Sequence, residues 1–360
     1  MADRPLELGY MSLGDHLADP VTGERQSQRR RFATLVEAAA RAEMVGFSSV
    51  WLGEHHFSEW IVSSPQVALA AIAERTTTVR LGTSVTLLVN LDPVRVAEDF
   101  ATLDLVSDGR AELAIGRGIL SQTYAAFGQD LDRSRPDFEE KLDLLLRLWR
   151  EGSVDWAGTV RPPLEGVEVQ PRPLQRPHPP VWVGGGTSEA SVDLAARLGL
   201  PLMLPSVFAK PERFAPMAER YRERYTAAGH DPAGMRVGGC NHCHVARTTQ
   251  EARQRWRPYY RAYYDLGQRA LAQSAGLWSG RTIAPFDFDG ATRGAGICGS
   301  PAEVTDRILA VRDLLGLDVH LLMFDLGGLP ERDLFATLDL FGAEVVPAVR
   351  GAVPATPAPA

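Results

Sequence analysis

Short apolar runs alternate with longer amphipathic segments along almost the whole chain, and this alternation restricts the folds open to it. The first run, from Leu6 to Met11, predicts a buried strand, and apolar residues then recur at helical spacing from Gln28 to Val45. The pattern repeats, with further strands expected at 49–52, 81–88, 111–115, 181–183, 202–204, 236–245 and 319–325, and helices at 65–75, 93–106, 136–151, 188–198, 211–228, 250–266, 301–315 and 331–345. Eight strands alternating with helices predict an α/β fold, the TIM (β/α)8 barrel.

The length of the chain fits one elaborated barrel. With 360 residues, of which 45% are hydrophobic, we expect a single domain over residues 1–346. The proline-rich stretch from Val154 to Pro180 is predicted to be a surface insertion in this domain, and the stretch from Ser274 to Cys298 a loop. Residues 347–360, rich in proline and alanine, are expected to form a disordered tail.

The charge of the chain and its lack of targeting signals bear on its binding partners and on its location in the cell. The formal net charge of -7 and the lack of a dense Lys/Arg run argue against nucleic acid or anionic membrane as the main partner. The first residues lack the apolar core of a signal peptide, and no segment has the ~20 apolar residues of a membrane span. Three cysteines suggest no disulfide framework, which fits a reducing compartment. We therefore expect a soluble, cytoplasmic protein.

One stretch places titratable groups directly where a strand must end. The apolar residues 50–52 suit a strand, and Glu54, His55 and His56 follow it. In (β/α) barrels the residues that do chemistry lie at the carboxyl ends of the strands, so Glu54 and His55 are the candidate catalytic residues. Adjacent residues leaving a strand point to opposite sides, so we expect His55 to face the barrel mouth and His56 to pack. Glu54 is expected to orient an imidazole or bind a ligand, or to be an ordinary ion-pair partner.

A second group of residues predicts an anion site after the fourth and fifth strands. Gly185, Thr187 and Ser188 belong to a glycine-rich turn that opens a helix and exposes N–H groups and hydroxyls at its positive end. Arg117 and Arg135 add charges that can reach the same phosphate, each bond to it contributing about 1.5–3 kcal/mol. Either arginine can equally form a surface ion pair, and glycine-rich turns also serve merely to begin helices.

A cysteine and histidine cluster in the seventh strand invites a zinc assignment. Cys240, His242 and His244 share one face of a strand, while Cys243 lies on the other, and the sequence has no second ligand pair at zinc spacing. We therefore predict no metal site. His242 and His244 are expected to line the substrate pocket or to be hydrogen-bonded core residues.

Taken together, these motifs resemble those of the bacterial luciferase-like flavin monooxygenases. The resemblance runs from about Leu6 to Pro347 and rests on Val50–Phe57, Asp92–Arg95 with Ala97–Asp99, Ser107–Arg110, Arg117–Gly118 followed by Phe127–Gly128, and Gly199–Pro201. The family implies a barrel that binds reduced FMN, forms a flavin 4a-hydroperoxide with O2 and oxygenates a small organic substrate. It also implies a homodimer. Because no dinucleotide fingerprint follows a strand, we expect reduced FMN to come from a separate flavin reductase.

The resemblance also assigns roles to individual residues. It makes His55 the catalytic imidazole that acts on the oxygenated flavin. It implies a non-prolyl cis peptide at Ser84–Val85, packed against the flavin ring. The phosphate of FMN would be bound by two arginines and by two hydroxyls of the fifth-strand loop, namely Arg117, Arg135, Ser188 and Ser191.

Two positions depart from the pattern of bacterial luciferase. The reactive cysteine before the loop arginine is replaced by Gly116, and a tryptophan near the flavin is replaced by Ser206. We expect the glycine to open space near the reactive edge of the flavin, and so to admit a bulkier substrate than a straight-chain aldehyde.

The leading prediction is therefore an oxidoreductase, a two-component FMN-dependent monooxygenase. A deazaflavin-dependent oxidoreductase on the same fold, which transfers hydride without O2, would have much the same phosphate site. A non-catalytic flavin-binding relative is a third alternative. The presence of Glu54 and His55 together with Arg117 and Arg135 argues against the third.

Overall fold

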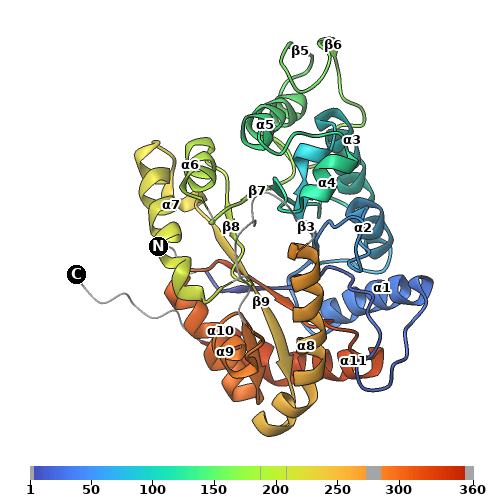
Figure 1. Ribbon diagram of the computed structural model, residues 1–360. Helices are drawn as coiled ribbons and strands as arrows, with labels where there is room; N and C mark the ends of the chain where they lie inside the picture. The colour runs from blue at the N-terminus through green and yellow to red at the C-terminus, as the bar shows by residue number, and fades with distance from the viewer. Residues whose placement is uncertain (1–3, 187, 208, 273–284, 353–360) are drawn as a thin grey trace.

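Parallel strands close into a barrel, as predicted. The structure, a computed structural model, describes residues 4–186, 188–207, 209–272 and 285–352. The strands follow one another around the barrel in the order β1-β2-β3-β4-β7-β8-β9-β11, and β11 pairs with β1 to close it (Figure 1). They are β1 (Glu7–Ser12), β2 (Ser49–Leu52), β3 (Arg80–Leu87), β4 (Leu113–Gly116), β7 (Val181–Gly184), β8 (Leu202–Leu204), β9 (Val237–Val245) and β11 (Val319–Met323).

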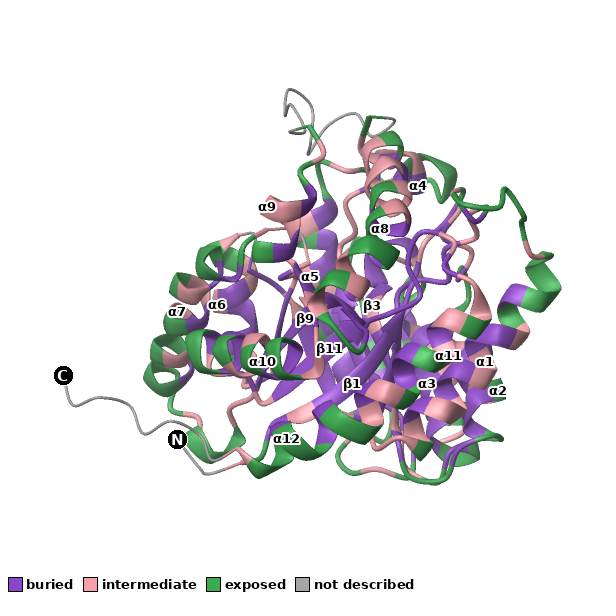
Figure 2. Cartoon of the chain, turned by 90° about the horizontal axis from the view of Figure 1, so that it is seen from below, coloured by how far each residue is buried: buried purple, intermediate pink, exposed green. Residues whose placement is uncertain are grey.

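Helices cover the outside of this barrel. They are α1 (Gln28–Met44), α2 (Pro65–Ala73), α3 (Pro93–Val106), α5 (Ser134–Arg150), α6 (Glu189–Leu198), α7 (Ala215–Ala227), α10 (Pro301–Leu315) and α11 (Glu331–Leu340). In α1, Ser27 accepts a hydrogen bond from the N–H of Arg30 and caps the first turn, while Leu35, Ala38 and Ala42 are buried on one face. Figure 2 shows the result: the strands of the barrel are largely buried, and the helices around them expose their outer faces.

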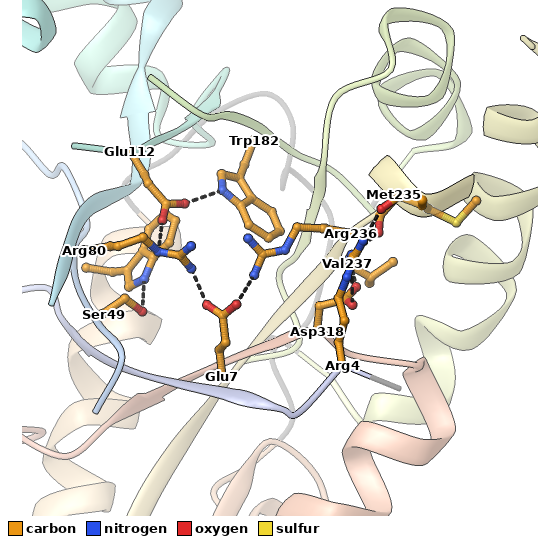
Figure 3. Close-up of polar contacts among 12 residues, drawn as sticks. Arg4, Glu7, Ser49, Arg80, Glu112, Trp182, Met235, Arg236, Val237 and Asp318 are labelled. Atoms are coloured by element: carbon orange, nitrogen blue, oxygen red, sulfur yellow. Dashed lines mark hydrogen bonds and ion pairs between the residues drawn. The ribbon is translucent and has the colours of Figure 1, made fainter. Parts of the chain in front are cut away.

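A network of charged side chains fills the amino-terminal end of the barrel (Figure 3). Glu7 forms ion pairs with Arg80 and Arg236, the latter at 2.6 Å between Oε1 and Nη2. Glu112 pairs with Arg80 and accepts a hydrogen bond from Trp182 Nε1 at 2.8 Å. Burial raises the pKa of Glu112, and the charge of Arg80 opposes this rise. Because these residues lie just before their strands or within the first two residues of them, the network stabilises the amino-terminal end of the barrel, opposite to the loops that follow the strands.

The stretch between β9 and α10 differs from the prediction. Helix α8 (Thr249–Ala272) is longer than expected, and the predicted loop 274–298 contains helix α9 (Phe288–Arg293) and the start of strand β10 (Gly296–Gly299). Residues 274–284 of that loop lie outside the described part of the chain. β10 forms because it pairs with the second half of β9, in register from Gly296 opposite His242 to Gly299 opposite Val245, whereas β8 pairs with the first half. A four-residue strand with glycine at both ends gives little signal in a sequence.

The carboxyl-terminal end of the described chain is also more regular than predicted. A π-helical turn (Phe341–Val345) continues α11 into helix α12 (Val346–Gly351), so the expectation of disorder from Pro347 is wrong for residues 347–351. Val346 and Val349 are buried, which fixes this helix against the barrel. The rest of the expected tail, 353–360, lies outside the described residues.

Smaller elements decorate the barrel. The predicted insertion contains an antiparallel hairpin of β5 (Val154–Trp156) and β6 (Leu164–Val167), which lies beyond α5 in Figure 1. A short helix, α4 (Ser121–Ala126), follows β4, and 3-10 turns occur at Leu88–Asn90, Pro211–Arg213 and Pro232–Gly234. No helix in the described part of the chain is long and apolar enough to cross a membrane.

Candidate active site

The predicted site residues gather at the carboxyl ends of four neighbouring strands. Strands β2, β3, β4 and β7 are adjacent in the sheet, so the loops that follow them share one part of the barrel rim. His55 follows β2, Ser84 and Val85 lie within β3, Arg117 follows β4, and Ser188 follows β7. The topology therefore brings together residues that are more than 130 positions apart in the sequence, from 55 to 188.

Glu54 orients the histidine that was not expected to be catalytic. Its Oε1 lies 2.8 Å from Nε2 of His56, and its Oε2 accepts a hydrogen bond from the backbone N–H of Leu87 at 3.0 Å. Glu54 and His56 are both buried. Both carboxylate oxygens are thus engaged within the protein, so Glu54 holds the end of β3 and His56 in place. His56 packs as predicted, with its ring edge-on to Phe127 at 4.8 Å.

His55 is the imidazole of this pair that remains partly open to solvent. Its backbone N–H donates to the carbonyl of Val62 at 2.9 Å, and its ring lies 4.7 Å from that of Trp60. Burial, and then the neighbouring His56, lowers the pKa of His55 to about 4. The imidazole is therefore neutral near pH 7 and can accept a proton or a hydrogen bond. Its Nδ1 is buried and has no hydrogen-bond partner in the part of the chain that the structure describes.

The peptide bond between Ser84 and Val85 is cis, as the resemblance implied. The side chain of Val85 packs between the ends of two neighbouring strands. A Cβ added at Gly116 would lie 2.7 Å from Val85 Cγ2, and one added at Gly184 would lie 2.9 Å from Val85 Cγ1. The expectation that Gly116 opens space is therefore wrong, because Val85 already fills that volume. The glycine instead lets Val85 approach β4 closely.

The predicted anion ligands lie in one continuous cluster. Arg117 Nη1 donates to Ser134 Oγ at 3.0 Å, Arg135 Nη2 lies 3.5 Å from Ser188 Oγ, and the hydroxyls of Ser188 and Ser191 are 3.0 Å apart. Arg135 belongs to the first turn of α5, which begins earlier than predicted.

This cluster carries positive charge that nothing in the described chain neutralises. Burial, and then the charge of Arg135, lowers the pKa of Arg117. Within the described residues, neither guanidinium pairs with a carboxylate; both contact hydroxyls only. Two repelling cations beside several hydroxyls fit an anion with more than one negative charge, and a phosphate monoester is such a group.

Helix α6 begins beside this cluster, so the positive end of its dipole lies near the two arginines. Ser188 is the N-cap residue of α6, yet its side chain makes no capping hydrogen bond and its hydroxyl contacts Ser191 instead. Gly185 does not offer its N–H to a ligand as predicted, because that N–H donates to the carbonyl of Met203 at 3.0 Å. Thr187, the other predicted ligand of this turn, lies outside the described residues. The amino-terminal end of α6 and the two arginines therefore lie side by side and form a candidate anion site.

Comparison with known proteins identifies the family to which this site belongs. The family model of the luciferase-like monooxygenases matches residues 6–318. The chain belongs to the luciferase-like monooxygenase family. The alkanal monooxygenase alpha chain of the Kryptophanaron alfredi symbiont is 26% identical, over 89% of this chain and 93% of that one. The oxygenase component of a flavin-dependent trigonelline monooxygenase from Acinetobacter baylyi is 25% identical, over 90% of this chain and 92% of that one.

Solved structures show the same barrel. The monooxygenase RslO1 from Streptomyces bottropensis superposes with a TM-score of 0.82 at 31% identity, over 95% of this chain and 99% of that one. The oxygenating constituent of 3,6-diketocamphane monooxygenase from Pseudomonas putida, in complex with FMN, has a TM-score of 0.76 at 20% identity over 95% and 98%. An F420-dependent secondary alcohol dehydrogenase has a TM-score of 0.72 at 21% identity over 96% and 99%. The last two comparisons establish the fold alone.

The cysteines and histidines of β9 are Cys240, His242, Cys243 and His244; the two histidines are buried and pack against aromatic side chains. His242 Nδ1 lies 2.9 Å from the hydroxyl of Tyr260, and His244 stacks on Trp256 at 5.9 Å. Burial raises the pKa of Cys240 to about 11, so its thiol stays protonated. No group of three or more metal-binding side chains in the described part of the chain is placed to hold a metal ion.

The sequence prediction missed a buried ionic group at the barrel rim. Arg31 of α1 pairs with Asp325, which follows β11, and its Nε donates to the carbonyl of Asp15 at 2.9 Å. Ser12 Oγ donates to Asp325 at 2.5 Å. Burial and the charge of Asp325 raise the pKa of Asp15 to about 7. A signal was present, since Asp325 directly follows an apolar strand, but its partners come from loops whose positions a sequence does not give.

Proposed function

We propose that this chain is the oxygenase of a two-component monooxygenase that uses reduced FMN and O2. The observation that carries the proposal is a pair of arginines, Arg117 and Arg135, that have no carboxylate partner among the described residues. They lie next to two serine hydroxyls, on the same rim as the neutral imidazole of His55. Family membership and the flavin-dependent relatives support it. Reduced FMN, when bound, would supply the two electrons with which O2 is activated.

The residues of the chain would divide the work of binding and of proton control. The two guanidinium groups, with Ser188 and Ser191, would hold the phosphate by charge-assisted hydrogen bonds. Val85, held against β4 and β7, would form the apolar surface behind the flavin ring. His55 would accept a hydrogen bond or a proton at the reacting oxygen, because its pKa of about 4 keeps it neutral. Glu54 would act as a positioning residue, through His56 and β3.

The relatives also suggest the partners. The trigonelline monooxygenase relative is named as an oxygenase component, which supports supply of reduced FMN by a separate flavin reductase. We therefore extend the proposal to such a reductase and to a small organic substrate. The homodimer and the cytoplasmic location remain predictions from the sequence.

An anaerobic titration with reduced FMN, followed by rapid mixing with O2, tests the proposal. We expect stoichiometric binding and then a transient near-ultraviolet absorbance distinct from that of oxidised FMN. His55→Asn should shorten the lifetime of this transient without changing the affinity for FMN, whereas His230→Asn, outside the site, should change neither.

Each contrary outcome has a definite meaning. Failure to bind reduced FMN, with binding of a reduced deazaflavin instead, would replace the proposal by the deazaflavin alternative. Binding of FMN with no transient in the wild type, and no product with any substrate screened, would indicate the non-catalytic alternative. An unchanged transient in His55→Asn would remove the role assigned to the imidazole.

A further inference from the structure

Three buried polar atoms at the barrel mouth have no hydrogen-bond partner in the described structure. They are Nδ1 of His55, Nε1 of Trp60 and Nε2 of His242. An unpaired buried donor has lost its bond to water without a replacement, so native proteins keep few such groups. One of the three atoms belongs to the proposed catalytic residue itself, and a bound ligand would give the group its missing partners.

The rings that carry these atoms are connected through one tyrosine. Trp60 lies 4.7 Å from His55 and 6.2 Å from Tyr263, measured between ring centroids, and Tyr263 lies 4.9 Å from His242. Tyr263 belongs to α8, which reaches across from β9 to the loop after β2, where Arg269 also pairs with Glu59. These residues, Trp60, Tyr263 and His242, are called the aromatic wall below. Trp60 and His242 are buried, whereas Tyr263 is partly exposed, as is His55 beside the wall, so the wall meets the mouth through Tyr263.

The free nitrogens of the wall are donors. Trp60 Nε1 carries a hydrogen and cannot accept. His242 is neutral, since burial lowers its pKa to about 3. Its Nδ1 is 2.9 Å from the hydroxyl of Tyr260, and a phenol donates more readily than it accepts, so the remaining hydrogen of the imidazole lies on Nε2. The wall therefore offers N–H groups to an acceptor such as a carbonyl oxygen.

The surroundings of the wall disfavour a negatively charged ligand. Burial, and then the charges of nearby groups that include Asp15 and Asp325, raise the pKa of the Tyr263 hydroxyl. Arg31, the cation that contacts these acids, already pairs with Asp325. A carboxylate at the wall would meet these acids without a free cation to balance it, whereas an uncharged ring would gain edge-to-face contacts with the aromatic side chains.

We propose that Trp60, Tyr263 and His242 bind the substrate, and that the substrate is an uncharged aromatic molecule bearing a carbonyl oxygen. The inference rests on the proposed function, because it places the ring of the substrate beside His55. The carbonyl oxygen accepts from Trp60 Nε1 and His242 Nε2, and Tyr263 packs against the ring.

Calorimetry on the flavin-free protein with three bicyclic probes tests this assignment. The probes are 1-tetralone, tetralin, which lacks the carbonyl, and 1,2,3,4-tetrahydro-1-naphthoate, which is charged. We expect 1-tetralone to bind about 5- to 30-fold more tightly than either of the others, the difference that one or two neutral hydrogen bonds make. Trp60→Phe keeps an aromatic ring but loses the N–H donor. It should weaken the binding of 1-tetralone by about 5-fold and leave the binding of tetralin unchanged.

Controls separate this assignment from the proposed function. Trp156→Phe, in the β5–β6 hairpin, should leave the affinity for every probe unchanged. The Trp60→Phe variant should bind FMN as tightly as the wild type does. Equal binding of 1-tetralone and tetralin, no binding of 1-tetralone, or an unchanged preference in Trp60→Phe would overturn the assignment, and water would then satisfy the donors. If Trp60→Phe does not fold, the comparison of probes on the wild type still decides. Loss of FMN binding alone would contradict only the proposed function.

Discussion

Replacing Arg117 by methionine should weaken the binding of FMN while leaving the binding of riboflavin unchanged. Riboflavin lacks only the phosphate, so the comparison isolates the anion site from the ring platform at Val85. Methionine keeps most of the apolar stem of arginine and removes its charge. Because the pKa of Arg117 is already lowered by burial and by Arg135, the ligand-free protein loses little with this charge.

The expected size of the effect follows from the contacts. Arg117 is held by Ser134 at 3.0 Å, so it is preorganised to donate to an incoming phosphate. A hydrogen bond to a charged group is worth about 1.5–3 kcal/mol, which corresponds to about 10- to 150-fold in the dissociation constant. Arg135→Met should weaken the binding of FMN by a similar factor. The double variant should lose less binding free energy than the two single variants lose together, because both cations act on the same anion.

Anaerobic titration of each variant with reduced FMN and reduced riboflavin measures both effects. Arg133→Met provides the matched control: this neighbouring arginine is 52% exposed and pairs with Asp137. We expect it to bind both flavins as the wild type does. If Arg117→Met weakens the binding of FMN and of riboflavin equally, or weakens the binding of neither, the assignment of this cluster as the phosphate site is refuted.

Three further predictions concern stability. Arg80→Met should lower the free energy of unfolding by about 3 kcal/mol in urea titrations, because it leaves the carboxylate of Glu112, only 1% exposed, without its ion pair. Gly116→Ala should lower the melting temperature, because its Cβ would lie 2.7 Å from Val85, and Val85→Ala should restore it; failure to restore would contradict the packing described. Stability should also fall as the pH is lowered from 6.5 to 4, by about 1.4 kcal/mol per pH unit for each buried histidine, since unfolded histidines take up protons there and folded ones do not; a flat melting profile would refute this. The histidines concerned, with pKa values of about 4 or about 3, are His55, His242, His244 and His320, and Asp15, with its pKa raised to about 7, opposes one of them.

The barrel could be predicted from the sequence because its strands are buried on both faces. Such strands appear as short apolar runs, and β3, expected at 81–88, is observed at Arg80–Leu87. The gathering of His55, Arg117 and Ser188 could be predicted as well, because barrel topology places every strand end on one rim. The cis peptide at Ser84–Val85 came from the family resemblance alone.

Contacts between loops could not be predicted in the same way. The sequence shows Glu54 beside both His55 and His56, and only the structure shows that it bonds to His56 and to the end of β3. It shows a glycine at 116, but the volume that the glycine vacates is filled by Val85 from another strand. Trp60 gave no signal, because its neighbour Tyr263 lies some 200 positions away in the sequence, in the predicted helix 250–266.

The excursion from β9 to β10 has a consequence for how such a barrel changes in evolution. The chain leaves the sheet after Val245 and returns at β10, whose residue Gly299 pairs with Val245 itself. A segment that departs and returns at hydrogen-bonded neighbours closes on itself, and the cost of closing it grows only slowly with its length. The segment between Val245 and Gly299 can therefore be replaced by another of different length or sequence while the barrel strands stay as they are. A lineage can acquire a new α8 with a different residue in place of Tyr263, which under the proposal above changes the substrate specificity. Neither the proposed phosphate site nor the ion pairs of Glu7, Arg80 and Arg236 would be disturbed.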